Sequence, residues 1–444
     1  MVKMPHWPIP MGNKPIDLDL SRVKTLLHLL GEPQNKLPPV IHVAGTNGKG
    51  STTAFLKSIF EGAGYKAHIY NSPHLVRFNE RITIAGEEIT DDFLYEVTEE
   101  CRLASEKINL QTTFFEGTTA AAFLAFSKVK ADVVILEVGM GGRFDATNVI
   151  DTPAMSIITS IAMDHVEFLG DSLVKIAFEK AGIIKPNCHC VISQQYPEVL
   201  ELLFKIAESR TSISYAYEYD WIVSKNSDKS FLYESPQKTF NLPAPSLQGD
   251  HQYINAGNAI TAILNLKQFK ISDEQIAKGI ANAHWPARLQ KLIDGRLVKQ
   301  LPNNCQIWVD GAHNEAGAHA LSIWLSDQPP LPTYMLFGMT KGRNCQAFLE
   351  NFIDKVEHVV GITIEAEPSS YSGEYVKKEA EKMNISSSTY SSIEEALAAI
   401  VKIESKPARI IVCGSLYLAG DLLFKNQGLN KKIINQKSNF AEGF

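Results

Sequence analysis

The chain alternates between short apolar runs and longer stretches in which apolar residues recur every three to four positions. Nearly continuous apolar runs at 40–44, 132–138 and 155–161 are typical of parallel strands that are buried on both faces of a sheet. Shorter runs at 66–70 and 190–192 also predict strands. The helical periodicity predicts helices over 16–30, 51–60, 91–107, 118–128, 172–181, 252–268 and 273–283. Strands that alternate with helices in this way predict an α/β fold with a doubly wound, mostly parallel sheet.

The pattern changes twice in the second half of the chain. It becomes polar and β-like from about 212 to 241, and the segment His284-Trp285-Pro286-Ala287-Arg288 breaks a helical pattern. We therefore expect a first domain over 1–285 and a second, smaller Rossmann-like α/β domain over 286–424. The strands of the second domain are expected over 306–309, 334–337, 358–362 and 409–412. Residues 425–444 form a polar tail of weak periodicity, and we expect part of it to be disordered.

Composition narrows the class of protein. The 444 residues are 45% hydrophobic and 21% charged, as in an ordinary globular protein, and the formal charge of −6 argues against a nucleic-acid surface. No apolar run approaches the roughly 20 residues that cross a bilayer, and the N-terminal segment lacks an apolar signal core. The six cysteines are scattered without a framework spacing, which indicates reduced thiols. We expect a cytoplasmic monomer that binds small molecules and neither nucleic acid nor membranes.

The segment Gly45-Thr46-Asn47-Gly48-Lys49-Gly50-Ser51 lies between an apolar run and a predicted helix. This order predicts a phosphate-binding loop, because glycines let backbone N–H groups approach phosphate oxygens and the helix N-terminus attracts anions. The spacing differs from the common phosphate-binding loop, since Gly50 separates Lys49 from the hydroxyl of Ser51. A glycine turn that merely joins strand to helix is the alternative. We expect an ATP site.

Polar residues at the ends of predicted strands are candidates for a metal site. Glu137 ends an apolar run, a position from which a carboxylate often holds Mg²⁺ beside phosphates, and a solvated acid is the alternative. His165 follows the next strand, but imidazole is an unusual Mg²⁺ ligand, so its own pattern leaves a ligand and a structural histidine equally open. Lys180 is typical of a solvated lysine at a helix end. Asp310 and His313 follow a strand of the second domain and could reach a ribose and a phosphate, or could belong to an ordinary polar turn.

Several motifs in fixed order resemble one family. They are 45–51, Ser72-Pro73-His74-Leu75, Glu80-Arg81-Ile82, Phe115-Glu116, 137–148, Asp164-His165, Glu179-Lys180-Ala181-Gly182, 310–314 and Gly414-Ser415. In this order the chain resembles the folylpolyglutamate synthases, more narrowly the bifunctional dihydrofolate synthase/folylpolyglutamate synthases of bacteria, which belong to the Mur ligase superfamily. The resemblance extends from Ile16 to about Leu423. It implies a Mur ligase central domain around the phosphate-binding loop.

The resemblance also implies roles for individual residues. It assigns ATP binding to Thr46, Asn47, Gly48, Lys49, Gly50, Ser51, Asn255, Arg288 and Asp310. It assigns the binding of Mg²⁺, expected as two ions, to Ser72, Glu137 and His165. It assigns catalytic roles to Lys49, Lys180 and His313. Lys180 matches a lysine that reacts with CO₂ to form a carbamate, which can serve the second magnesium ion. The substrate segments are Thr113, Phe114, Phe115 and Glu116 together with Phe144, Asp145 and Ala146, with Phe115 stacked on a pterin ring.

This chain departs from the family pattern at three places. Ala287 stands where the family usually has glycine before Arg288, and a left-handed turn tolerates alanine poorly. The loop 340–344 replaces the family's Asp-Lys-Asp, and Asp19 stands where glycine is common. None of these departures touches the phosphate or magnesium residues.

The implied reaction is an ATP-dependent ligation. The γ-phosphoryl group would pass to a substrate carboxylate, and L-glutamate would then displace phosphate to form an amide. The carboxylate would belong to dihydropteroate, to the γ-carboxylate of tetrahydrofolate, or to both in turn. A muramyl-peptide or other Mur-type ligase is the alternative enzyme, and a nucleotide-binding regulator without catalysis is the alternative of another class.

Overall fold

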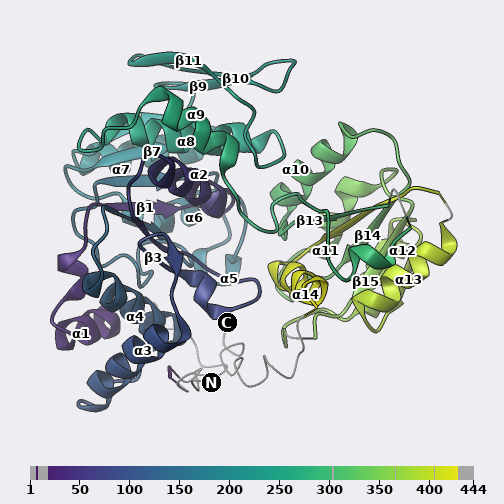
Figure 1. Cartoon of the computed structure of the whole chain (residues 1–444), viewed down its shortest axis with the longest axis horizontal. Coiled ribbons are helices and arrows are strands. Elements are labelled where there is room, and N and C mark those ends of the chain that lie inside the picture. Colours follow the sequence, from purple (N-terminus) through teal and green to yellow (C-terminus); the bar gives the residue numbers. More distant parts are fainter. Residues whose placement is uncertain (1–6, 9–18, 303–304, 366, 405, 429–444) are drawn as a thin grey trace.

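A computed structural model describes residues 7–8, 19–302, 305–365, 367–404 and 406–428. Figure 1 shows two α/β units side by side, the first in purple to green and the second in green to yellow. The expected α/β class with two sheets is confirmed. The break between the two sheets falls in the segment that follows helix α9 (Asp273–Asn282) and precedes strand β12 (Gln290–Leu292).

The first unit is built on an eight-stranded sheet in the order β4-β3-β2-β5-β1-β6-β7-β8. All neighbouring strands from β2 to β8 pair in parallel, whereas β3 and β4 pair antiparallel at one edge. In chain order these strands are β1 Val40–Ala44, β2 Ala67–Tyr70, β3 Ile82–Ile84, β4 Glu87–Glu88, β5 Val133–Glu137, β6 Met155–Ile158, β7 His189–Ile192 and β8 Ile213–Ala216. The central strands β1, β5 and β6 are buried along their whole length, as their apolar runs predict.

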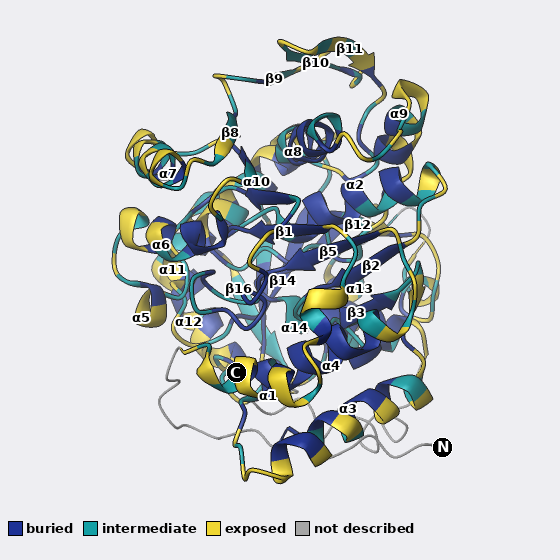
Figure 2. Cartoon of the chain, turned by 90° about the vertical axis from the view of Figure 1, so that its left-hand side faces the viewer, coloured by how far each residue is buried: buried dark blue, intermediate teal, exposed yellow. Residues whose placement is uncertain are grey.

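Helices cover both faces of this sheet. They are α1 Ser21–Leu29, α2 Lys49–Gly62, α3 Asp91–Glu106, α4 Phe114–Lys128, α5 Val166–Leu169, α6 Leu173–Lys180, α7 Pro197–Ser209, α8 His251–Asn265 and α9 Asp273–Asn282. One core forms where α2, α8 and α9 pack on the sheet, and another forms under α1, α3 and α4. Figure 2 shows the central strands β1, β5 and β14 (Thr333–Phe337) buried and the outer faces of α3 and α7 exposed. A three-stranded antiparallel sheet lies over α8, with β9 Ile222–Lys225, β10 Phe231–Ser235 and β11 Lys238–Leu242.

The second unit has a six-stranded sheet in the order β12-β13-β17-β14-β15-β16, parallel except for β12. Its strands are β12 Gln290–Leu292, β13 Gln306–Val309, β14 Thr333–Phe337, β15 His358–Ile362, β16 Ser387–Tyr390 and β17 Arg409–Cys413. Its helices are α10 Glu315–Ser326, α11 Cys345–Leu349, α12 Gly373–Lys382, α13 Ile393–Ile403 and α14 Leu416–Asn426. Short 3₁₀ helices of the two units span Pro33–Lys36, Phe78–Arg81, Ala181–Ile183, Val298–Gln300 and Glu350–Phe352.

Some element boundaries differ from the expected ones. Helix α4 begins at Phe114, four residues before the expected start at 118, because Thr113 caps it. Helix α14 continues to Asn426, two residues into the expected tail, while 429–444 and 16–18 lie outside the described residues. Over the described part of the chain, no helix combines the length and the apolar character that crossing a bilayer requires.

Close packing of α2 against α9 depends on Gly279. A Cβ at this position would lie 2.7 Å from the Ile59 Cα and 2.9 Å from the Ile59 backbone nitrogen. We expect Gly279→Ala to lower the free energy of unfolding by about 1–3 kcal/mol, because neither backbone can move independently. Urea unfolding followed by circular dichroism measures this change.

Gly62 provides the matched control, because it is an exposed helical glycine whose Cβ would meet no atom within 4 Å. We expect Gly62→Ala to be neutral or to stabilise the protein by up to about 1 kcal/mol through helix propensity. Equal effects of the two substitutions would contradict the packing argument.

Candidate active site

The phosphate-binding loop lies between β1 and α2 and is shaped by contacts that only glycine permits. Gly48 has φ +87°, and a Cβ there would overlap the Asn255 side chain. A Cβ on Gly50 would lie 2.7 Å from the Trp285 Nε1. The backbone N–H groups of Thr46 and Asn47 donate to the Ser160 carbonyl oxygen at 2.9 and 3.1 Å. The first-turn N–H groups of α2, which begins at Lys49, have no carbonyl partner within the helix and are therefore available to an anion.

Two lysines share one backbone acceptor beneath this loop. The Lys49 Nζ donates to the Gly45 carbonyl oxygen at 3.1 Å and to that of Thr46 at 3.2 Å, and the Lys180 Nζ donates to the Gly45 oxygen at 2.9 Å. Burial, and then the charge of Lys49, lower the pKa of Lys180 to about 7. At neutral pH a substantial fraction of Lys180 is therefore an uncharged amine, the form that reacts with electrophiles.

Glu137 places a buried carboxylate at the end of β5, beside Val43 of β1. Burial raises the pKa of Glu137 to about 7, although the charges of Lys49 and Arg288 oppose that rise. Among the described residues the Glu137 carboxylate has no hydrogen-bond donor. The structure therefore brings Glu137 to Lys49 and to Arg288 of the second unit, and it leaves the carboxylate oxygens available to a cation.

The other expected metal residues approach the same edge of the sheet from neighbouring strands. Ser72 follows β2, which pairs with β5, and His165 follows β6 with φ +50°. Burial lowers the pKa of His165, and the charge of Lys180 contributes to that decrease. Within the described ranges, no three His, Cys, Asp or Glu side chains lie close enough to hold a metal ion by themselves. A divalent cation beside Glu137 would therefore also need oxygen ligands of other kinds, such as a hydroxyl, a carbamate or a phosphate.

The Asp164 carboxylate of the first unit forms ion pairs with two residues of the second unit. It lies 3.2 Å from the Arg343 Nη1 and 3.5 Å from the His313 Nε2. Burial opposes ionisation, but the hydrogen bond from His313 and the charge of Arg343 hold the pKa of Asp164 well below its usual range. The side-chain amides of Asn47 and Asn314 donate to each other at 3.3 and 3.1 Å across the same boundary. The second unit is therefore held against the phosphate-binding loop.

The connection between the units adopts a strained backbone. Ala287 has φ +55° and Leu289 has φ +43°, so the backbone is left-handed at Ala287 although alanine tolerates this conformation poorly. The Asp310 carboxylate accepts the Leu289 N–H at 2.8 Å and the Ala312 N–H at 2.7 Å, and the Gly311 N–H donates to the Ala287 carbonyl at 2.9 Å. Asp310 therefore holds the turn that carries the neighbouring arginine, in addition to any contact with a nucleotide.

The expected substrate segment at 113–116 begins helix α4. Glu116 accepts the Thr113 N–H at 2.8 Å and pairs with Arg22 at 2.8 Å, so its carboxylate has a structural role. The Phe115 ring lies against Gly139, where a Cβ would be 2.8 Å from its Cε2, and Phe114 packs in the core against Phe78. Phe115 is therefore close to the strand end that carries Glu137.

The second expected substrate segment follows Gly139. The Arg143 guanidinium lies 4.3 Å from the centre of the Phe144 ring, and Ala146 is buried in the same core as Phe114. Asp145 is 6% exposed and accepts the Met140 N–H at 2.9 Å. This segment is thus adjacent in the chain to the Gly139 position on which the Phe115 ring lies.

Sequence reasoning missed three residues of this arrangement. Asp164 was recognised only as a neighbour of His165, Arg343 lies in the loop that departs from the family pattern, and Trp285 was noted only as part of a boundary. A strand-end aspartate is the one signal that could have indicated Asp164. The pairing of Asp164 with Arg343 depends on how the units meet, which no local pattern encodes.

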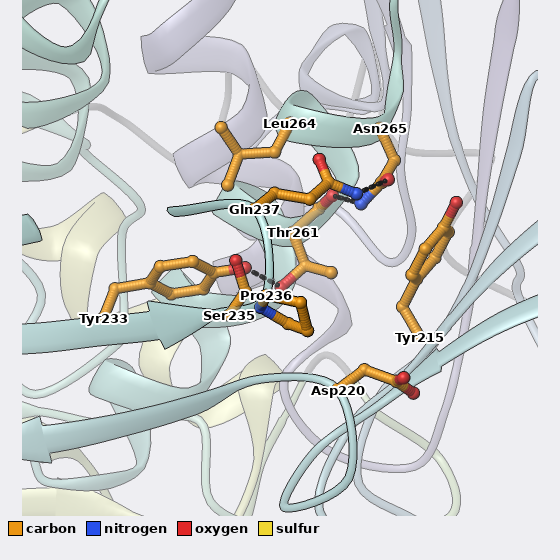
Figure 3. A pocket seen from close by; sticks show the side chains of 9 residues that line it. All are labelled: Tyr215, Asp220, Tyr233, Ser235, Pro236, Gln237, Thr261, Leu264 and Asn265. Carbon is orange, nitrogen blue, oxygen red and sulfur yellow. Dashed lines mark hydrogen bonds between the residues drawn. The ribbon is translucent and has the colours of Figure 1, made fainter. Parts of the chain in front are cut away.

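A separate cavity of about 90 Å³ lies between the three-stranded sheet and α8. Figure 3 shows Tyr233 bonded to Thr261 and Gln237 bonded to Asn265 at its wall. None of the expected site residues lines this cavity. The candidate active site is therefore the charged cluster between the two units.

The comparisons with known proteins agree with this arrangement. A family model of the Mur ligase middle domain matches residues 43–263, and one of the dihydrofolate synthetase C-terminal domain matches residues 295–425. A dihydrofolate synthase/folylpolyglutamate synthase of Bacillus subtilis (strain 168) is 34% identical over 434 residues, which cover 94% of this chain and 96% of the relative. The chain belongs to the dihydrofolate synthase/folylpolyglutamate synthase family.

Solved structures of this family share the whole fold. The structure of E. coli FolC in complex with DHPP and ADP has a TM-score of 0.83 and 29% identity, covering 96% of this chain and 95% of that chain. A bifunctional folylpolyglutamate synthase/dihydrofolate synthase with Mn, AMPPNP and L-glutamate bound has a TM-score of 0.82 and 27% identity, with coverages of 94% and 95%. This family member is therefore an enzyme, an ATP-dependent ligase. These matches do not support the two alternatives, a muramyl-peptide ligase and a regulator without catalysis.

The buried carboxylate of Glu137 should cost stability above neutral pH. Its pKa rises from 4.5 to about 7 on folding, so the folded chain binds this proton more tightly, and the stabilisation is lost as the pH rises through 7. We expect Glu137→Gln to raise the free energy of unfolding at pH 8 by roughly 1–3 kcal/mol, and we expect the gain to shrink toward pH 5.5. Urea unfolding at both pH values, without added nucleotide or divalent cation, measures this gain.

Glu116→Gln is the control, because it removes an ion pair with Arg22 and leaves the helix cap. We expect this control to lower stability at pH 8. A Glu137→Gln variant that is less stable than the wild type at pH 8 would contradict the analysis of its burial.

Proposed function

We propose that this chain joins L-glutamate to a pteroate through an acyl phosphate, with release of ADP and phosphate. The observation that carries the proposal is the cluster between the two units, in which Lys49, Lys180 and Glu137 face Arg288 and His313. Two anions, a nucleotide phosphate and a substrate carboxylate, must approach each other in the first step of such a reaction. The partly buried cations Lys49 and Arg288, beside the N-terminus of α2, favour that approach.

The nucleotide would bind along the phosphate-binding loop. The first-turn N–H groups of α2 and the Lys49 ammonium would contact the phosphate oxygens, and Ser51 and Asn255 border the same loop. Arg288 and Asp310 would contact the nucleotide from the second unit. This placement makes the nucleotide a bridge between the units.

The residues present fit a divalent cation beside those phosphates. Glu137, Ser72 and a carbamate on Lys180 would supply oxygen ligands, and His165 would supply a nitrogen ligand. Mg²⁺, as two ions, would provide the charge neutralisation that phosphoryl transfer requires. The proposed carbamate forms when the neutral Lys180 amine attacks the carbon of CO₂ and then loses one proton.

The pteroate would occupy the space beside Phe115 and Asp145. The Phe115 ring offers a face for the pterin, and the Asp145 carboxylate offers an acceptor for its N–H groups. Thr113 and Glu116 hold the start of α4, which positions Phe115. Phe144 and Ala146 complete the proposed wall.

The proposed reaction has two steps, and each step forms one bond and breaks another. A carboxylate oxygen of the pteroate attacks the γ-phosphorus of ATP, and the bond to the ADP oxygen breaks. The neutral α-amino group of L-glutamate then attacks the acyl carbon, phosphate leaves, and the nitrogen loses a proton. His313 and Arg343 would close this space, which protects the acyl phosphate from water.

The proposal includes two carboxylate donors, dihydropteroate and the γ-carboxylate of tetrahydrofolate. One chain contributes both halves of the site, so we propose a monomer with small-molecule substrates as its only partners. We also propose that the reaction takes place in the cytoplasm.

An ADP-release assay tests the function directly. We expect ADP release that requires L-glutamate together with dihydropteroate or tetrahydrofolate, and we expect Glu137→Ala to lower it at least 100-fold. Activity with dihydropteroate and L-glutamate but not with tetrahydrofolate and L-glutamate would identify a dihydrofolate synthase that does not extend the polyglutamate tail. Glutamate-independent ADP release, or full activity of Glu137→Ala, would overturn the proposal.

A further inference from the structure

His42 is a polar residue on a face of the central strand β1 that is otherwise apolar. His42 is fully buried in β1, between Leu136 of β5 and Ser156 of β6. Its Nε2 lies 2.9 Å from the Thr147 Oγ1, while its Nδ1 is buried and has no hydrogen-bond partner among the described residues. An unpartnered buried nitrogen costs stability, and a leucine would pack at this position without that cost. The histidine therefore needs an explanation other than packing.

The direction of the hydrogen bonds defines the form of His42. The Thr147 hydroxyl has a single proton, which it donates to the Asp145 Oδ1 at 2.5 Å. The Thr147 Oγ1 can then only accept from His42, so the His42 Nε2 is the donor. Burial, and then the charge of Lys185, lower the pKa of His42 to about 3, which agrees with a neutral ring protonated on Nε2.

This chain of bonds ends on the carboxylate beside the proposed pterin site. The Asp145 Oδ1 accepts both the hydroxyl and the backbone N–H of Thr147, at 2.5 and 3.0 Å. The Asp145 Oδ2 accepts the Met140 N–H at 2.9 Å, and the Gly139 N–H makes a weaker hydrogen bond to the same carboxylate. Burial raises the pKa of Asp145, whereas these donors favour its charged form. The result is an oriented carboxylate whose Oδ2 accepts one close backbone hydrogen bond, from Met140, whereas Oδ1 accepts two.

We infer that His42 and Thr147 are positioning residues for the pteroate: they fix the Asp145 carboxylate so that its Oδ2 accepts N–H groups of the 2-amino-4-oxopyrimidine ring. This inference rests on the proposed function. The His42 donor polarises the Thr147 hydroxyl and stops it from rotating away from Asp145. Neither His42 nor Thr147 touches the substrate.

Matched substitutions separate positioning from packing. Thr147→Val keeps the shape and removes the hydroxyl, whereas Thr147→Ser keeps the hydroxyl. His42→Leu removes the donor, whereas His42→Gln keeps an N–H group at a similar reach. The ADP-release assay would be run with varied dihydropteroate or tetrahydrofolate at saturating ATP and L-glutamate, and then with varied ATP.

We expect Thr147→Val and His42→Leu each to raise the KM for the pteroate about ten-fold, with the KM for ATP unchanged within two-fold. Thr147→Ser and His42→Gln should stay within about three-fold of the wild-type pteroate KM. The double variant His42→Leu/Thr147→Val should be no worse than Thr147→Val alone, because His42 acts only through Thr147.

A role in packing alone predicts a different outcome. Equal changes in both KM values, additive effects in the double variant, or a wild-type pteroate KM in Thr147→Val would each overturn the inference. If His42→Leu does not fold, as judged by thermal melting, the Thr147 pair decides the question by itself. A wild-type protein that releases no ADP with any pteroate overturns the proposed function and this inference together, whereas an active wild type with an unaffected Thr147→Val overturns this inference alone.

Discussion

The site depends on a single backbone carbonyl that accepts two lysine ammonium groups. Lys49 and Lys180 both donate to the Gly45 oxygen, and the orientation of that oxygen requires glycine, because Gly45 has φ +154° and a Cβ would overlap the Thr159 side chain. Burial, and then repulsion between Lys49 and the ammonium form of Lys180, lower the pKa of Lys180 to about 7. An anion bound at the loop would offset this repulsion. The phosphates of a nucleoside triphosphate carry the negative charge that this requires.

The two units contact each other beside this phosphate-binding loop. Polar contacts join Asp164 with Arg343 and His313, and Asn47 with Asn314, while Leu75 and Val76 of the first unit pack against the apolar core of the second. The polar contacts can open and re-form at little cost in water, which suits an enzyme that must admit substrates and then exclude water. The left-handed Ala287 in the connection stores backbone strain of roughly 1 kcal/mol, which a turn fixed by Asp310 can hold. Closure therefore combines these charged contacts with the burial of Leu75 and Val76.

The parts of the fold that were predictable are those where burial determines the residue pattern. Strands β1 and β5 are apolar along their length because helices cover both faces, and their polar ends indicated the edge that holds the site. Strands β12 and β16 were not predicted, because each lies at a sheet edge and carries polar, partly exposed residues. The phosphate-binding loop and Glu137 could be proposed from local pattern.

Other parts of the site depend on contacts that no local pattern contains. The role expected for Arg288 came from the family resemblance, and for His313 the position after a strand left both a phosphate contact and an ordinary turn open. Asp164 and Arg343 meet only because the two units face each other. His42 was hidden in an apolar run, where its neighbours gave no indication of a polar partner. Its partner Thr147 lies 105 residues further along the chain, between β5 and β6, so only the folded arrangement reveals the bond. Polar residues in predicted central strands therefore need a structural explanation before they are treated as packing.

The proposed carbamate on Lys180 changes the balance of charge that burial creates. As an ammonium, Lys180 is disfavoured by desolvation and by Lys49, which is why its pKa falls to about 7. As a carbamate, the same side chain becomes an anion beside Lys49, so repulsion turns into attraction and the oxygens can serve a divalent cation. The Lys49 charge that disfavours the ammonium form therefore favours the carbamate, while burial keeps part of the amine neutral and reactive. A lysine at the exposed end of a helix would have neither property, so the position of α6 beneath the Gly45 carbonyl is what makes Lys180 suitable for this role.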